Sequence, residues 1–293
     1  PNGTIIEHVF ATNATTRSFR VVVTATDSFG NSSQRASHRL SVKKWELQED
    51  VKSPGVTHLV YGGSLGIDGV DFSTREDGAV VVREWFLNNH AVRQESVITG
   101  VTGKIIVFAQ AGNDVMDATG ITRLAVELHG DDGDDMLKGG SLADWLIGGE
   151  GSDWLEGNGE NDRLEGGNGR DLLVGGMGAD TIMGGGGNDL LLAASFLQAN
   201  DRSAAVHLLE EWKRTDHESN MNHRIGNLQG LADHEDRMNA HYLLETSSLV
   251  EDEGAIDQLF GAEGTDWLLL DPALDLHPDR EPDDWLTVIP QGG

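Results

Sequence analysis

Residues 130–192 repeat one pattern every nine residues, and this repeat constrains the fold more than any other feature of the chain. The seven copies are GDDGDDMLK, GGSLADWLI, GGEGSDWLE, GNGENDRLE, GGNGRDLLV, GGMGADTIM and GGGGNDLLL. The sixth place is always aspartate, and the eighth is always aliphatic: Leu137, Leu146, Leu155, Leu164, Leu173, Ile182 and Leu191. Such a short fixed period is typical of a solenoid, in which each repeat is one unit stacked on its neighbours.

Each copy has the composition of a glycine-rich turn followed by a short strand. Glycine accepts positive φ because it has no Cβ to clash, and the side chain in the eighth place points inward. Two copies, 18 residues, then complete one coil of a flattened right-handed roll, so alternate copies share an edge. The sequence predicts two columns of aspartates, one with Asp135, Asp153, Asp171 and Asp189 and the other with Asp144, Asp162 and Asp180.

The charge of this segment predicts a bound cation. Residues 131–192 hold fourteen acidic residues and three basic ones, a net charge of −11. Carboxylates stacked at the strand spacing of about 4.8 Å repel by roughly 3 kcal/mol per pair at an effective dielectric near 20. Ca²⁺ suits the pattern because it takes six to eight oxygen ligands and mixes carboxylates with carbonyls, whereas Mg²⁺ requires a stricter octahedron. Zn²⁺ prefers His or Cys, and the array has neither. The alternative is a metal-free, glycine-rich solenoid.

The copies quoted above resemble the hemolysin-type calcium-binding repeats of the RTX family, whose consensus is G-G-x-G-x-D-x-U-x. The resemblance implies a parallel β-roll that holds Ca²⁺ between successive coils through the sixth-place aspartate and backbone carbonyls. It also implies export from bacteria and folding outside the cell. Two copies depart from the consensus, because Leu142 and Glu160 replace the glycine of the fourth place. Both copies lie on the edge with Asp144 and Asp162, which brings calcium binding there into question.

Outlying copies extend the set of expected calcium ligands. AQAGNDVMD (109–117) places Asp114 21 residues before Asp135, where it fits one coil earlier. DEGAIDQLF (252–260) and GAEGTDWLL (261–269) place Asp257 and Asp266 in the sixth place after a long interruption. We therefore expect calcium ligands at Asp114, Asp135, Asp144, Asp153, Asp162, Asp171, Asp180, Asp189, Asp257 and Asp266.

The rest of the chain divides around this array into segments of different composition. Strand-like runs at 1–44, such as SFRVVVTATDSFGNSS (18–33), resemble part of a PKD-like or immunoglobulin-like β-sandwich, which implies an extracellular spacer or adhesive module. Fold class is thus expected to be all-β, with a small helical insertion. The expected segments are the partial sandwich (1–44), a linker with a Pro-Gly break (45–56), a β-rich lead-in (57–108), the roll (109–192), a helical insertion or cap (193–246) and a resumed roll (247–293).

The insertion contains SAAVHLLEEWKR (203–214), in which Ala205, Leu208, Leu209 and Trp212 fall on one face of a helix. Seventh-place side chains on one side of the roll form an exposed apolar stripe, which requires cover. The stripe consists of Met136, Trp154, Leu172 and Leu190. We predict that the helix packs over the later part of the stripe, with a partner-binding helix as the alternative.

Composition excludes several classes of protein. The chain has 49 acidic and 21 basic residues, a net charge of −28, so a nucleic-acid interface is not expected. It contains no cysteine, hence no disulfides, and no apolar run long enough to span a membrane. The chain begins at Pro1 without a leader, which we interpret as a fragment of a longer protein.

Motifs that would indicate catalysis or sugar binding are weak. GGSLG (62–66) fits the G-x-S-x-G elbow of hydrolases, but a turn-rich strand pattern follows Ser64 instead of a helix. HEDRMNAH (234–241) lacks the second histidine of a zinc motif, because Met238 stands in its place. Trp145, Trp154 and Trp267 all occupy seventh places, where packing is favoured over a sugar-binding platform.

The sequence therefore predicts a non-catalytic, calcium-binding structural or adhesive segment of a secreted or cell-surface protein, with an unknown surface or matrix partner. An accessory export-and-folding module for a protease or lipase elsewhere in the parent chain is the alternative. An enzyme within these residues is the third possibility. Because extracellular calcium modules bind at about 10⁻⁴ to 10⁻³ M, we also expect folding to depend on calcium.

Overall fold

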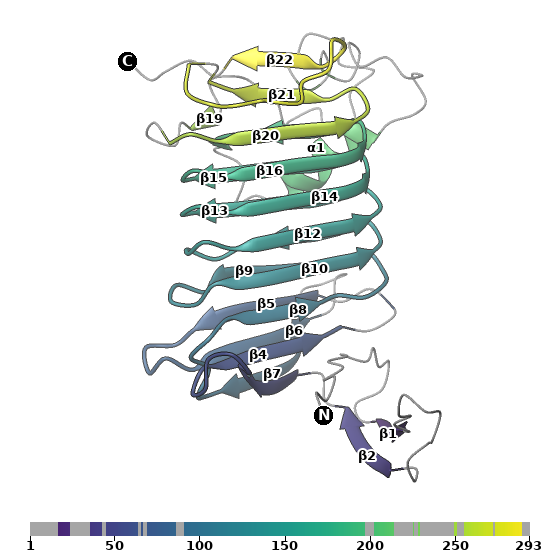
Figure 1. Ribbon diagram of the computed structural model, residues 1–293, viewed down its shortest axis with the longest axis vertical. Coiled ribbons are helices and arrows are strands. Elements are labelled where there is room, and N and C mark those ends of the chain that lie inside the picture. The colour runs from purple at the N-terminus through teal and green to yellow at the C-terminus, as the bar shows by residue number, and fades with distance from the viewer. Residues whose placement is uncertain are drawn as a thin grey trace, which may run out of the picture.

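Two long β-sheets stacked face to face form the body of the computed structural model (Figure 1). The structure describes residues 17–23, 36–42, 45–63, 66, 69–85, 91–196, 202–213, 225, 228, 249–250, 255–271 and 273–288. The first sheet contains β3 (Trp45–Glu49), β4 (Thr57–Gly62), β8 (Ile105–Phe108), β10 (Val126–Asp132), β12 (Trp145–Glu150), β14 (Arg163–Gly169), β16 (Thr181–Gly187) and β20 (Gln258–Glu263). The second contains β5 (Gly69–Thr74), β6 (Val80–Trp85), β7 (Val92–Ile98), β9 (Val115–Gly120), β11 (Met136–Lys138), β13 (Trp154–Gly159), β15 (Leu172–Met177), β17 (Leu190–Leu192), β21 (Trp267–Leu270) and β22 (Trp285–Val288).

Successive coils are stacked in register at a spacing of 18 residues. Leu137 pairs with Leu155 in the second sheet, and Leu146 pairs with Leu164 in the first, both in parallel ladders. The chain thus alternates between the sheets every nine residues, as the period predicts. This confirms a nearly all-β chain with a parallel β-roll.

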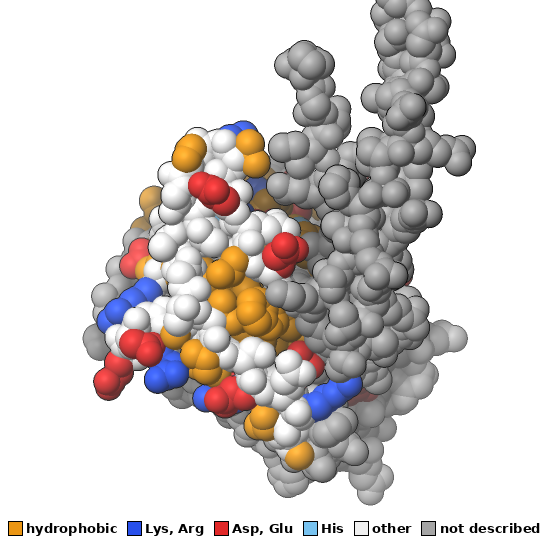
Figure 2. Space-filling view, turned by 90° about the horizontal axis from the view of Figure 1, so that it is seen from below, with side chains coloured by type: hydrophobic (Ala, Val, Ile, Leu, Met, Phe, Trp, Pro, Cys, Tyr) orange, Lys and Arg blue, Asp and Glu red, His pale blue; other side chains and the backbone are white. Residues whose placement is uncertain are grey.

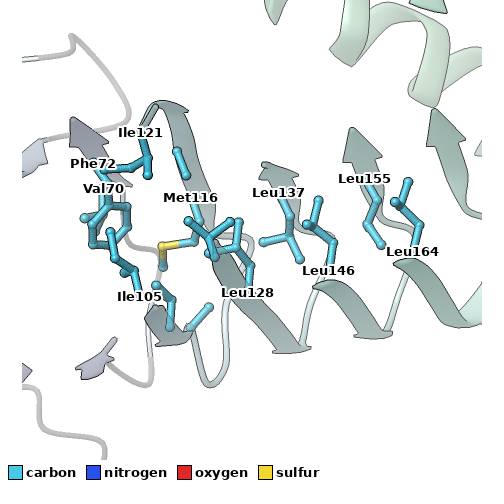
Figure 3. Close-up of a cluster of buried hydrophobic side chains, with 14 of the residues drawn as sticks. Val70, Phe72, Ile105, Met116, Ile121, Leu128, Leu137, Leu146, Leu155 and Leu164 are labelled. Atoms are coloured by element: carbon cyan, nitrogen blue, oxygen red, sulfur yellow. The ribbon is translucent and has the colours of Figure 1, made fainter. Parts of the chain in front are cut away.

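The eighth-place side chains fill the space between the two sheets. All seven aliphatic residues of the array are 0% exposed and belong to one core cluster. Figure 3 shows four of them, Leu137, Leu146, Leu155 and Leu164, side by side along the roll. Each fully buried aliphatic side chain contributes roughly 1.5–3 kcal/mol through removal of its surface from water. The core is therefore a regular column of leucine and isoleucine, continued toward the N-terminus by larger residues such as Phe72 and Met116.

The N-terminal end of the roll is antiparallel. Strands β5, β6 and β7 form a meander, and β3 pairs antiparallel with β4. The linker expected at 45–56 is therefore wrong in its first part, where β3 forms the edge of the first sheet. The Pro-Gly break is the turn of the β3–β4 hairpin: Gly55 has φ of 90°, and the Val56 N–H donates to Ser53 O at 3.0 Å. Trp45 packs against the core, which explains why the segment is ordered on the roll.

Hydrophobic side chains gather on this N-terminal end face, surrounded by scattered charged groups (Figure 2). The edge strands at this end of the sheets, β3 and β7, carry three partly exposed apolar residues, Leu47, Val92 and Val97. Two further strands, β1 (Arg17–Val23) and β2 (Ala36–Val42), pair antiparallel in a separate two-stranded sheet. The sandwich expected over residues 1–44 otherwise lies outside the described residues.

A long insertion leaves the roll after β17 and returns before β20 without disturbing the register. Ile182 of β16 pairs with Leu259 of β20, and Leu191 of β17 pairs with Leu268 of β21. The insertion begins and ends in a short antiparallel pair, β18 (Ser195–Phe196) with β19 (Leu249–Val250). It contains helix α1 (Arg202–Lys213).

Helix α1 covers the apolar stripe on the outer face of the second sheet, as predicted. Leu208 is 1% exposed and Trp212 0%, and both belong to one buried cluster with Leu172 and Leu190. The Trp212 ring lies 6.1 Å from that of Trp267, centroid to centroid. The described helix is too short and too polar to cross a lipid bilayer.

Candidate calcium site: two rims of stacked aspartates

The sixth-place aspartates line the two edges of the roll, each immediately before a strand. One edge, here called the long rim, precedes the strands of the second sheet and contains Asp114, Asp135, Asp153, Asp171, Asp189, Asp266 and Asp284. The other edge, the short rim, precedes the strands of the first sheet and contains Asp144, Asp162, Asp180, Asp257 and Asp275. The structure thus brings all ten predicted aspartates into two columns. Each is at most 5% exposed.

One oxygen of each carboxylate is used to hold the coils together. The Asp135 N–H donates to Oδ1 of Asp153 at 2.8 Å, and the Asp153 N–H donates to Oδ1 of Asp171 at 2.8 Å. The same bond recurs across the insertion, where the Asp189 N–H donates to Oδ1 of Asp266 at 2.8 Å. Each rim is therefore a continuous ladder in which the backbone of one coil is fastened to the carboxylate of the next.

The second oxygen is buried and lacks a hydrogen-bond donor among the described residues. This holds for Oδ2 of Asp135, Asp153, Asp162, Asp171, Asp189 and Asp266. A buried carboxylate oxygen without a partner is costly unless a cation or donor compensates it. Six repeated instances point to one common ligand, positively charged and able to bind oxygen.

A glycine in the first place of each copy leaves room beside this oxygen. A Cβ built on Gly166 would lie 2.5 Å from Oδ2 of Asp171 and 2.5 Å from the carbonyl oxygen of Gly184 in the next coil. A side chain would therefore fill the cradle that a carboxylate and a carbonyl share. Those two donor types are the ones that Ca²⁺ combines, so the residues present fit this ion.

Burial raises the pKa of seven rim carboxyls far above the usual value for aspartate: Asp135, Asp144, Asp153, Asp162, Asp171, Asp189 and Asp266. Loss of hydration is the largest cause throughout; it raises the pKa of Asp153 to about 8 and of Asp162 to about 9. At Asp171 burial, followed by the negative charges of Asp189 and Asp153, raises the pKa to about 9. The protein alone thus disfavours ionised carboxylates in these columns, and a divalent cation would reverse that preference.

Backbone geometry distinguishes the two departures from the consensus. Glu160 keeps the left-handed turn of the fourth place with φ of 66°, so its copy retains the regular shape. In the copy with Leu142, neither that residue nor Gly140 has a positive φ. There the Gly140 N–H donates to Oδ2 of Asp144 at 2.6 Å and satisfies the oxygen that lacks a donor at residues such as Asp153 and Asp171.

A second ladder runs beside the long rim through the residues of the fifth place. The Ser152 N–H donates to Oδ1 of Asp134 at 2.8 Å, and the Arg170 N–H donates to Oγ of Ser152 at 3.2 Å. These bonds run from a coil to the one before it, opposite in direction to the aspartate ladder. Adjacent coils are therefore fastened in both directions at the long rim.

Sequence reasoning missed Asp275 and Asp284, which extend the two columns by one coil. The Asp257 N–H donates to Oδ1 of Asp275 at 3.1 Å, and the Asp266 N–H donates to Oδ1 of Asp284 at 2.9 Å. Glycine is missing around both, yet each lies 18 residues after a predicted aspartate. Spacing alone could have found them. Their Oδ2 atoms accept N–H donors from Asp271 and Glu281, as at Asp144, so they resemble closing coils.

Among the described residues, none of the other candidate motifs forms part of this site. Ser64 of GGSLG and the HEDRMNAH segment (234–241) lie outside the described residues. Trp154 and Trp267 are fully buried beneath the insertion, which confirms packing, while Trp145 is 37% exposed and donates from Nε1 to Glu165. Within the described part of the chain, no three His, Cys, Asp or Glu side chains converge as a metal cluster. Metal binding at the rims would therefore depend on backbone carbonyls.

Stacked parallel coils with buried aspartates along both edges define a β-roll built to hold cations. A family model described as the RTX calcium-binding nonapeptide repeat, in four copies, matches residues 129–163 and 156–191. This part of the chain consists of RTX calcium-binding repeats, and Ca²⁺ is the ion they bind. No curated protein matches the chain.

Proposed function

We propose that the chain is a non-catalytic structural segment of an extracellular protein, in which Ca²⁺ held along both rims completes the fold. The ligands would be Oδ2 of the rim aspartates together with carbonyls of the glycine-rich turns. The ten predicted aspartates are the ligand candidates. Of these, Asp144 is the weakest, since an N–H already occupies its second oxygen.

The observation that carries this proposal is the row of buried Oδ2 atoms without donors. At Asp135, Asp153, Asp162, Asp171, Asp189 and Asp266 a backbone N–H compensates the first oxygen of the carboxylate, but no donor among the described residues compensates the second. Ca²⁺ suits a gap between two carboxylates that is lined by carbonyls, because it carries two positive charges and binds six to eight oxygens. Glycine in the first place keeps that gap open.

Calcium binding should stabilise the folded roll in proportion to the number of filled gaps. At tenfold saturation, one site adds roughly 1.4 kcal/mol to the free energy of unfolding. Five sites would add about 7 kcal/mol, which equals the whole stability of many domains. The roll is therefore expected to be loosely ordered where calcium is scarce and compact where it is abundant.

Calcium titration by calorimetry, with far-UV circular dichroism in calcium and in EGTA, tests the proposal. We expect several sites per chain, a gain of β-structure and a higher melting temperature in calcium, with Mg²⁺ as the control ion. Identical spectra and melting curves in calcium and EGTA would contradict the proposal.

An extracellular location follows from the affinity expected of such sites, because extracellular modules work at about 10⁻⁴ to 10⁻³ M calcium. RTX repeat proteins are typically secreted, and an adhesive or spacer role fits the antiparallel pair β1–β2 that precedes the roll in the sequence. An export-and-folding module for an enzyme elsewhere in the parent protein would depend on the same calcium-induced folding of the roll. An upstream protease or lipase domain in the parent sequence would favour that second role.

A further inference from the structure

Helix α1 is anchored at a specific part of the roll. Its apolar face packs on the outer side of the second sheet, where Leu208, Leu209 and Trp212 join the cluster with Leu172 and Leu190. The long-rim aspartates precede the strands of this sheet, whereas those of the short rim precede the first sheet. The helix therefore lies against the side of the roll to which the long rim belongs.

The last two residues of α1 make three polar contacts with the fifth-place ladder of the long rim. Trp212 Nε1 donates to Asn188 O at 2.9 Å, and Lys213 Nζ lies 2.8 Å from Oδ2 of Asp134. The carbonyl oxygen of Lys213 accepts a bond from Arg170 at 3.1 Å. Asp134, Arg170 and Asn188 each stand immediately before a rim aspartate, namely Asp135, Asp171 and Asp189.

We propose that α1 is a clamp on the long rim, and that its docking is coupled to calcium occupancy of that rim but not of the short rim. This inference rests on the calcium-binding function proposed above. Trp212 and Lys213 would act as positioning residues, because they touch the residues that precede the ligands and not the ligand carboxylates themselves.

The coupling follows from the geometry of the gaps. An ion held between two coils requires a fixed separation of the aspartates on each side, since calcium–oxygen distances span only about 2.3–2.6 Å. Contacts from 212–213 to positions 134, 170 and 188 span three coil spacings and restrict the same separation. By linkage, a clamp that favours the calcium-bound spacing must itself be held more firmly when calcium is bound.

Hydrogen exchange of the full chain, followed by mass spectrometry over α1 in rising calcium, tests the clamp. The matched rim variants are Asp171→Asn on the long rim and Asp162→Asn on the short rim, both with a donor-free Oδ2 in the parent protein. We expect Asp171→Asn to lower the calcium-induced protection of α1 by about fivefold or more, the lower range of allosteric coupling. Asp162→Asn should leave it unchanged. Equal effects of the two variants would overturn the clamp.

The reverse direction is tested from the helix. Lys213→Met removes the contact to Asp134, and Glu210→Gln is the control because it removes only the partner of Lys213 within α1, at 3.5 Å. Lys213→Met should weaken calcium binding in calorimetry by about fivefold or more at a subset of sites, and Glu210→Gln should not. If calcium binds normally and α1 protection is independent of it, the clamp fails and the calcium function stands. If the parent protein binds no calcium, both fail.

Discussion

Replacing Asp171 by asparagine separates the two roles of a rim carboxylate. The asparagine side chain would keep the Oδ1 acceptor for the Asp153 N–H, at 2.8 Å in the parent protein, but would lose the negative charge at the oxygen without a donor. The new amide could donate toward the carbonyl of Gly184, which borders the same cradle. The substitution thus retains the ladder and removes the proposed ligand.

The expected effect has opposite signs with and without calcium. Burial and the charges of Asp189 and Asp153 raise the pKa of Asp171 to about 9. The unfolded chain ionises near pH 4, so this group reduces stability as the pH rises from there to about 9. In EGTA at pH 8, asparagine removes that penalty and should leave the melting temperature equal or higher.

With calcium about tenfold above its dissociation constant, the same change weakens the two gaps that flank Asp171. A loss of about 1.4 kcal/mol per gap gives roughly 3 kcal/mol, or a melting temperature lower by roughly 6–12 °C. The assay is thermal unfolding followed by circular dichroism, with Asp144→Asn as the matched control. Because the Gly140 N–H satisfies Oδ2 of Asp144, that variant should keep the calcium-dependent increment. A similar fall for Asp171→Asn in EGTA and in calcium would refute the reasoning.

Three further predictions concern protons, the core and the turns. Burial raises the pKa of Asp153 and of Asp189 to about 8, so calcium should displace protons from these carboxyls at neutral pH and the affinity for calcium should rise from pH 6 to 9. Equal calorimetric heats of calcium binding in buffers of different ionisation enthalpy would contradict this. Leu155→Ala should lower the free energy of unfolding in calcium by about 2–5 kcal/mol, measured by urea denaturation, with Thr181→Ala on the outer face as the control. Gly169 has φ of 144° and a Cβ there would overlap the carbonyl of Gly151, so Gly169→Ala should destabilise the roll. Glu160 has φ of 66°, so Glu160→Gly should stabilise the roll by about 1 kcal/mol. Changes in melting temperature of the same sign for both variants would exclude a conformational cause.

The periodic part of the fold could be predicted from sequence because each structural requirement recurs. An aliphatic residue in the eighth place, aspartate in the sixth and glycine at the turns indicate the same half-coil seven times, and the structure has the core and both columns in those places. The helix was predictable for a related reason. An apolar face at 208–212 and an apolar stripe at 154–190 each required a partner, and they cover one another.

The aperiodic parts were harder, because single local signals have several physical solutions. Pro54-Gly55 is as suitable for a hairpin turn as for a domain boundary, and only the pairing of Trp45 with Tyr61 decides between them. At Leu142 the sequence showed a departure, but not that the Gly140 N–H would take the oxygen of Asp144. Asp275 escaped notice because the glycines that marked its predecessors are missing.

The aspartate ladder gives the roll a direction. Every rim amide from Asp114 to Asp266 finds its acceptor on the coil that follows it in the chain, so a coil is complete only when its successor is in place. Shortening the protein from its C-terminus would remove the acceptors of the sixth-place amides in the last remaining coil. Shortening it from its N-terminus would leave the acceptors of the remaining sixth-place amides in place. Each coil therefore takes part of its rim hydrogen bonding from the coil that follows it, so its stability depends on the presence of that coil.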